Sequence, residues 1–548
     1  MPAEPAESDT SAETRWEATA APRTASRRPS WWRTQSEARA ERVQQMCCFE
    51  DENILRAVPS SCVLRFGGRL LSSSDGGFQS YAMSKREQRI RDFISHNWSM
   101  ARAEKFLCLA LHFNVTGALV LCSTAAVGVG AATYFGALPT FWCLDLRGSR
   151  LLAGVCAPAI GEAAALLGLV AWHDLAALAG QRGSPCFLDK ACIHQLDAKL
   201  KEAGIKRLAA FICVSDRLLV VYSESYLRKL WTVYELASFL LMRPEGEVKV
   251  VSPVMPQCII AGSMIVTLFW MTWNACRMEV VLAAIGRHFP PWFICGTYGL
   301  LAISFCAVMT RRWAREQQRI LAAVFDFSIS RAACACEDDR GLVCGNVVAM
   351  MKHLQLVPPE ATEDAALHAF DSYVRERMPQ AVEEAFFGEF GVPLTWAQLI
   401  LAPSTSAYFA DQIVPMIQQG NSAKLVIAWT AFAISYSFVI LPTTGISIFL
   451  ATRMFLHLGG LREVLYLMLL VVFGAVHAFG LWVLLQHLAY AADNSIGALV
   501  ASLLLEAASV AIMWGAVRLS RPSGAPETEA LERPAASRFE PEAAEFEI

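Results

Sequence analysis

Charged residues are scarce in this chain. Asp, Glu, Lys and Arg make up 18% of its 548 residues, and 55% of the residues are hydrophobic. Soluble domains carry about 25% charged residues, so a deficit over this length predicts a membrane protein that also has soluble parts. The net charge is −3, so we expect no nucleic-acid partner.

The chain also lacks the motifs of several common binding sites. It contains no Walker loop and no Gly-rich dinucleotide fingerprint. Its 17 cysteines have no regular disulfide spacing, and the Cys/His groups at 186–194 and 334–344 lack the paired spacing of a structural zinc site. We therefore expect no metal, and we expect the soluble parts to face a reducing cytosol.

Long apolar runs are what the chain has instead. The runs at 115–135 and 151–172 each reach the roughly 20 residues that a membrane-spanning helix needs. The segment at 395–418 is also apolar, but Pro403 and Asp411 interrupt it, so we expect a broken or re-entrant segment there. The lipid bilayer is thus the first predicted partner. The predicted membrane regions are hairpins over 115–172 and 258–311 and a bundle over 395–518.

Arginines indicate the orientation in the membrane. Four of them follow the fourth apolar run: Arg311, Arg312, Arg315 and Arg319. The positive-inside rule places that end of the run in the cytosol. We expect a multi-pass integral membrane protein with eight crossings, or seven as the alternative, and with both termini and the soluble parts cytosolic. Which membrane holds it is left open.

Three ionisable residues fall inside predicted spans: Glu162, His477 and Glu506. Such groups are functional candidates by default, because a charge is costly in the bilayer. The alternative is that each pairs with a neighbouring helix. A channel or transporter is therefore one of the functions left open.

The remaining segments are polar. Residues 1–80 and 519–548 contain few aliphatic residues and are predicted to be disordered tails. Residues 312–392 are polar and helix-prone, and we expect a cytosolic helical segment. Residues 88–105 and 174–256 alternate between strand and helix patterns, which predicts an α/β domain with a parallel sheet, split by the first hairpin.

One helix of this domain presents a carboxylate. The stretch "SESYLRKLWTVYELASFLLM" follows a buried-strand pattern, "RLLVVYS", and places Trp231 and Glu235 four residues apart on one helical face. Apolar residues recur around Trp231 at helical spacing, so it is expected in the core whatever the function. Glu235 is either a site residue or a solvated acid beside that stripe.

Several of these stretches together resemble a known family. "DFISH", "CFLDK", "LLVVYS", "WTVYEL" and "VKVVSPV" follow the order of the TIR (Toll/interleukin-1 receptor) domain. The whole arrangement resembles multi-spanning TIR-like proteins of unicellular algae. The resemblance covers about a fifth of the chain and implies a flavodoxin-like parallel sheet beside an all-α polytopic membrane region. Thr232 stands where the family often has Cys, a membrane hairpin splits the domain, and no fifth strand is visible.

The resemblance also implies a function. TIR domains signal by self-association, and some cleave NAD at the nicotinamide–ribose bond with the Glu of the helix signature, which is Glu235 here. The implied NAD-site residues are Ser95, His96 and Asn97 after the first strand, Phe187, Asp189 and Lys190 after the second, and Ser223, Tyr226 and Trp231 around the helix. Three alternatives remain open: NAD hydrolysis, a non-catalytic interaction scaffold, and a TIR-regulated channel or transporter.

Overall fold

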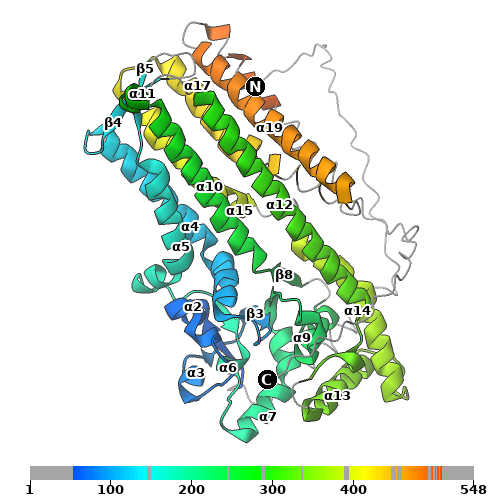
Figure 1. The fold of residues 1–548 in the computed structure, drawn as a ribbon. Coiled ribbons are helices and arrows are strands. Elements are labelled where there is room, and N and C mark those ends of the chain that lie inside the picture. Colours follow the sequence, from blue (N-terminus) through cyan, green and yellow to red (C-terminus); the bar gives the residue numbers. More distant parts are fainter. Residues whose placement is uncertain are drawn as a thin grey trace, which may run out of the picture.

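The computed structural model describes residues 54–144, 150–243, 246–285, 291–334, 337–387, 394–442 and 460–491, with scattered positions between 444 and 508. These residues form an α/β domain, in the lower part of Figure 1, and a bundle of long apolar helices above it. The predicted tail at 519–548, the cytosolic termini and Glu506 lie outside the described residues.

A six-stranded sheet forms the centre of the α/β domain. The strands lie in the order β2-β1-β6-β3-β7-β8; β3, β6, β7 and β8 pair in parallel, and β1 pairs antiparallel with both β2 and β6. The prediction of a mostly parallel sheet is therefore confirmed. The strands are β1 (Arg56–Pro59), β2 (Lys85–Arg86), β3 (Ile90–His96), β6 (Pro185–Phe187), β7 (Ser215–Val221) and β8 (Glu247–Val251).

The prediction of a disordered tail over residues 1–80 is wrong for residues 54–80. Strand β1 pairs with β6, and helices α2 (Ser60–Gly68) and α3 (Phe78–Ala82) follow it. The side chains of Val58, Val63 and Leu71 are buried. A short apolar segment thus completes the edge of the sheet, and the polar composition of the preceding residues concealed it in the sequence. Residues 1–53 lie outside the described part.

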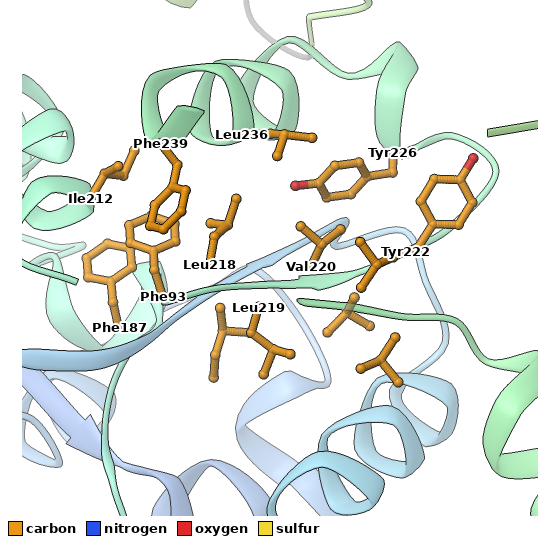
Figure 2. Packing of buried hydrophobic residues seen from close by; sticks show 14 of the residues in the cluster. Phe93, Phe187, Ile212, Leu218, Leu219, Val220, Tyr222, Tyr226, Leu236 and Phe239 are labelled. Carbon is orange, nitrogen blue, oxygen red and sulfur yellow. The ribbon is translucent and has the colours of Figure 1, made fainter. Parts of the chain in front are cut away.

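Helices cover both faces of the sheet. Helix α9 (Leu230–Met242) lies on one face with α8 (Leu208–Cys213), and α4 (Arg102–Tyr134) lies on the other. The alternating side chains of β7 therefore meet apolar partners in both directions, which explains the continuous apolar run in its sequence. Figure 2 shows Leu218 pointing towards α9 and Leu219 pointing the opposite way.

Phenylalanines hold the strand β6 against its neighbours. The ring of Phe93 on β3 stacks on Phe187 of β6 at a centroid distance of 4.4 Å, and Phe187 lies 4.7 Å from the ring of Phe211 on α8. All three side chains are fully buried. Each such burial stabilises the fold by about 1.5–3 kcal/mol. Phe187 is therefore a core residue (Figure 2).

The first long hairpin leaves the domain after β3 and returns before β6. Helices α4 and α5 (Ala157–Leu178) pack closely, because a Cβ atom at Gly168 would lie only 2.5 Å from the Cα atom of Ala118. A two-stranded sheet, β4 (Thr140–Leu144) and β5 (Arg150–Gly154), closes the far end of the hairpin.

Further helices complete the bundle (Figure 1). They are α10 (Val254–Arg277), α11 (Glu279–Ile285), α12 (Pro291–Phe325), α15 (Leu394–Ser406), α17 (Ala423–Ser435) and α19 (Gly460–Ala491). Within the described residues, four helices are long and apolar enough to cross a membrane by length and composition: Arg102–Tyr134, Ala157–Leu178, Val254–Arg277 and Val464–Ala491.

The segment at 394–418 is helical throughout, so the prediction of a broken segment is wrong, whereas the alternative of a re-entrant segment stays a prediction. Helix α15 contains Pro403 and continues through a π-helical stretch (Ala407–Ile413) into α16 (Val414–Gln418). Asp411 does not break the helix, because its Oδ2 atom accepts a hydrogen bond from the backbone N–H of Ala157 at 3.0 Å. The carboxylate thereby caps the N-terminus of α5, where the helix dipole favours a negative charge.

The polar segment after the fourth apolar run extends the domain. Helix α12 continues past Arg319, and α13 (Glu337–His353) and α14 (Glu363–Phe387) pack beside α9 and β8. The hydroxyl of Tyr373 on α14 donates a hydrogen bond to the carbonyl of Leu240 on α9 at 3.2 Å. Helices thus cover the region next to β8, where the resemblance would have placed a fifth strand.

Candidate functional site

The carboxyl ends of β3 and β7 define the place where the predicted site residues gather. In chain order, the four parallel strands lie 2-1-3-4 across the sheet, so the connections from β3 and from β7 leave towards opposite edges. The region outside the strand ends where such loops diverge is the usual ligand position in sheets of this kind. Residues after β3 and after β7 both face this point.

A chain of hydrogen bonds joins β3, the loop after β7, and α9. The Ser95 hydroxyl donates to Glu235 Oε2 at 2.5 Å and lies 2.6 Å from the hydroxyl of Tyr226. Ser95 and Tyr226 are fully buried, whereas Glu235 keeps some accessible surface. Figure 2 shows the hydroxyl end of Tyr226 between β7 and α9. The structure therefore brings together three of the predicted residues from three separate segments.

Local geometry explains why Glu235 reaches Ser95. The Thr232 hydroxyl donates to the carbonyl oxygens of Tyr226 and Lys229, which fixes the loop to the first turn of α9. Glu235 then lies about one turn further along, on the face directed at the sheet. Thr232, the residue that departs from the family pattern, thus has a structural role here.

The carboxyl group of Glu235 is largely protonated at neutral pH. Burial raises the pKa of Glu235 to about 8; the hydrogen bond from Ser95 lowers it, and the charge of Asp189 raises it further. Burial also raises the pKa of Tyr226 well above its usual range. The hydrogen-bonded chain is therefore neutral in the free protein, and it can supply one negative charge when the carboxyl loses its proton.

A second hydrogen-bonded link runs beside the first. The side-chain amide of Asn97 donates to the Ser225 hydroxyl at 2.6 Å, and Ser223 lies 3.5 Å from Ser225 between the two hydroxyl oxygens. Asn97 also accepts from the backbone N–H of Ser99 at 3.1 Å through its Oδ1 atom. The loops after β3 and β7 are thus tied together at two points.

Positive charge gathers next to these links around an indole ring. Trp98 Nε1 donates to Asp189 Oδ2 at 2.9 Å. The ammonium groups of Lys105 and Lys190 lie 4.8 Å and 5.7 Å from the centroid of the Trp98 ring. Both lysines are buried, and burial lowers the pKa of Lys190. This cluster lies on the α4 side of the site and joins it through Asp189.

His96 is neutral in this environment. Burial lowers the pKa of His96 to about 4, although the charge of Asp189 acts in the opposite direction. Its ring packs edge-on against Trp98 at a centroid distance of 4.4 Å, and its Nε2 atom is buried without a hydrogen-bond partner in the described part of the chain. A neutral imidazole with a free nitrogen can accept or donate one hydrogen bond.

Three predicted residues make their contacts away from the hydrogen-bonded chain of Ser95, Tyr226 and Glu235. Phe187 lies in the core, so its position does not support contact with a ligand. The Lys190 ammonium donates to the carbonyl of Ser73, towards the N-terminal segment, at 2.9 Å. Trp231 Nε1 donates to Asp339 Oδ2 on α13 at 3.1 Å, on the side of α9 that faces α13. Trp231 therefore connects helices, as its periodic apolar neighbours suggested.

Several residues of the site were not found in the sequence. Trp98, Lys105 and Ser225 carry no motif, and they enter the site only because the strands bring their segments together. Asp339 lies 108 residues beyond its partner Trp231. The one available signal was the position of Trp98 and Ser225 directly after predicted strands, where site residues of parallel sheets collect.

No family model, curated protein or solved structure matches this chain. Among the described residues, no group of three or more His, Cys, Asp or Glu side chains is placed to hold a metal ion.

Proposed function

We propose that this protein is a membrane-anchored, TIR-like signalling protein whose α/β domain hydrolyses NAD at Glu235. The observation that carries the proposal is the hydrogen bond from Ser95, at the carboxyl end of β3, to Glu235 on α9. The strand order 2-1-3-4 adds support, since it is the flavodoxin-like order without the fifth strand. The α/β domain and the arginine-rich end of the fourth apolar run face the cytosol in this proposal.

The chemistry requires one ionised carboxylate. Cleavage breaks the bond between the ribose C1′ atom and the nicotinamide nitrogen, whose electron pair leaves with the neutral nicotinamide. Water then forms the new C1′–O bond and releases a proton, giving ADP-ribose. The transition state has oxocarbenium character, and a fixed negative charge near the ribose stabilises it. Glu235 is the only carboxylate bound to the Ser95–Tyr226 chain in the described residues.

The raised pKa of Glu235 fits a cationic substrate. The nicotinamide ring of NAD carries a positive charge, and a nearby opposite charge favours the ionised carboxylate. Binding of NAD should therefore release the proton of Glu235, whereas the empty site keeps the carboxyl neutral. The Ser95 hydroxyl donates to the ionised oxygen, and the Tyr226 hydroxyl holds Ser95 in place.

The test is nicotinamide release by the full chain. The protein is reconstituted in phosphatidylcholine nanodiscs and incubated with NAD, with and without clustering by a bivalent antibody against an added tag. Glu235→Ala should lower the rate by about 10²-fold or more. Glu247→Gln is the matched control, because Glu247 is 62% exposed at the opposite end of the sheet.

Two results would overturn the catalytic proposal. One is equal release by the wild type and Glu235→Ala; the other is no release by the wild type even when it is clustered. The second result would leave the non-catalytic function, signalling by self-association of the α/β domain. The satisfied hydrogen bonds at Glu235 are compatible with a purely structural role as well.

A further inference from the structure

A cavity of about 580 Å³ lies between the long helices, and one end of it reaches Met255 and Trp313, which also pack in the core cluster of the α/β domain. Helices α10, α12, α15 and α19 contribute to its wall, together with Tyr408, Tyr436, Leu441, Pro442, Thr444, Gly445 and Ile448. These helices run beside one another in the upper part of Figure 1. The volume falls within the roughly 300–1,000 Å³ typical of small-molecule sites.

The wall is apolar and offers little to a polar ligand. None of the described residues that line the cavity carries a charge. Its hydroxyl groups already have protein partners: the Tyr408 hydroxyl accepts from Trp482 Nε1 at 2.9 Å, and the Thr310 hydroxyl donates to the carbonyl of Ala307 at 3.0 Å. A ligand that entered with unpaired polar groups would pay for their desolvation, so the cavity selects a hydrocarbon.

The cavity is long. On α12 its wall extends from Gly296 to Trp313, which is about 25 Å at a rise of 1.5 Å per residue. An extended hydrocarbon chain lying along α12 fits within this length.

We propose that this cavity is a binding site for one acyl chain of a membrane lipid, held parallel to α10 and α12. Two of the helices in its wall, α10 and the Val464–Ala491 part of α19, are long and apolar enough to span a bilayer. One leaflet is about half of the roughly 30 Å hydrocarbon core, so an acyl chain of that depth fits within the length of the wall. The lipid thus reaches the cavity from the layer in which the helices lie. This site is independent of Glu235 and of NAD.

Two glycines supply matched test positions. A Cβ atom added at Gly299, in the wall of the cavity, would meet nothing within 4 Å. The same holds for Gly480 on α19, which is exposed and outside the wall. Gly299→Phe therefore fills the cavity, and Gly480→Phe places the same ring outside it. Ala475→Phe, also in the wall, is a second filling variant in case Gly299→Phe does not fold.

The experiment is photolabelling of the full chain. The protein is reconstituted in phosphatidylcholine nanodiscs that contain phosphatidylcholine with a diazirine in its acyl chain, irradiated, and digested for mass spectrometry. We expect more adducts on the wall residues of α10 and α12 than on outward-facing positions. Val472, which is 56% exposed, is one such outward-facing position. Folding of each variant is checked by size-exclusion chromatography.

Filling the cavity should remove this enrichment. Gly299→Phe, or Ala475→Phe, should lower the adducts on the wall by about tenfold, because the ring obstructs the path of the acyl chain and leaves it less room to pack. Gly480→Phe should leave them unchanged. Adducts spread evenly over wall and outer surface, or an unchanged pattern in both filling variants, would overturn the proposal.

Discussion

At the residue scale, the protonation state of Glu235 connects the structure to a measurable pH dependence. The carboxyl is hydrogen-bonded to Ser95 and has a pKa of about 8 in the free protein. In the proposed reaction, only the ionised form stabilises the transition state. The free protein must therefore lose one proton before it can act on NAD.

The pH dependence of NAD cleavage should report this proton. We expect kcat/KM for nicotinamide release to rise with pH and to level off above a pKa of about 8, because kcat/KM follows the groups of the free enzyme. Steady-state rates between pH 6 and pH 9.5 would check this, on the order of two units to either side of the pKa. A flat profile in the active wild type would contradict the role of Glu235.

The same group should influence stability in a different way. The pKa of Glu235 is near 4.5 in the unfolded chain and about 8 in the folded one, so the folded state binds more protons between these values. The free energy of unfolding of the wild type therefore falls as pH rises from about 4.5 to about 8, and the loss is complete above that window. Glu235→Gln cannot ionise and escapes this loss.

We expect Glu235→Gln to become more stable relative to the wild type as pH rises through this window. Thermal unfolding of both proteins at about pH 5, 7 and 8.5, followed by intrinsic fluorescence in nanodiscs, would measure the difference; these values run from near the lower end of the window to just above its upper end. All other titrating groups are shared and cancel in the comparison. An unfolding difference that does not change with pH would show that the carboxyl is already ionised in the folded protein.

At the element scale, the sequence predicted helix α9 but not its contact with α13. The buried strand β7, the helix at Trp231 and Glu235, and the strand at Ile90–His96 follow from local patterns in the sequence. The hydrogen bond from Trp231 to Asp339 joins residues more than a hundred positions apart, and no local pattern records such a contact. Strand β1 escaped notice for a related reason: its four residues are too few for a periodic signal.

The Trp231–Asp339 contact should contribute to the attachment of α13. Asp339→Ala removes the acceptor of the Trp231 N–H, and we expect a loss of about 1 kcal/mol in the free energy of unfolding. Trp231→Phe removes the donor, so in a double-mutant cycle the second substitution should cost less when the first is present. Chemical unfolding of the four proteins measures this coupling, and strictly additive losses would contradict the contact.

The residues of the candidate site also fall into those that were predicted correctly and those that were not. The sequence identified Ser95, Tyr226 and Glu235, which lie at strand ends or in the helix signature, and the structure joins them by hydrogen bonds. Phe187 was predicted to line the NAD site, but its side chain lies in the core. An apolar residue at the end of a short strand gives the same sequence pattern whether it packs in a core or lines a pocket. The Phe93–Phe187–Phe211 packing decides in favour of the core.

At the scale of the whole molecule, α12 links the helical bundle to the α/β domain. Its residues 296–313 line the acyl-chain cavity, and Glu316 accepts a hydrogen bond from the Ser252 hydroxyl, just after β8, at 2.7 Å. Arg319 lies 3.4 Å from Glu224, in the loop between β7 and Tyr226. One continuous helix thus touches both the cavity and the loop that carries Tyr226.

Breaking the Glu316 contact should loosen this end of the domain. We expect Glu316→Ala to speed amide hydrogen exchange in peptides that cover 223–229 and 252–256, because α12 then loses its hydrogen bond to Ser252. Glu376→Ala, at an exposed position on α14, is the control. Unchanged hydrogen exchange in Glu316→Ala would contradict the prediction that the Ser252–Glu316 hydrogen bond stabilises these two segments.

The hairpin between β3 and β6 has a consequence for biosynthesis. The two strands are neighbours in the sheet, yet a ribosome makes β3 and then the whole of α4 and α5 before it reaches β6. The sheet can therefore close only after both hairpin helices have been made and have packed side by side. Assembly of this domain thus depends on the packing of the first two long helices, and a fragment that omits the hairpin would lack the connection that joins its halves.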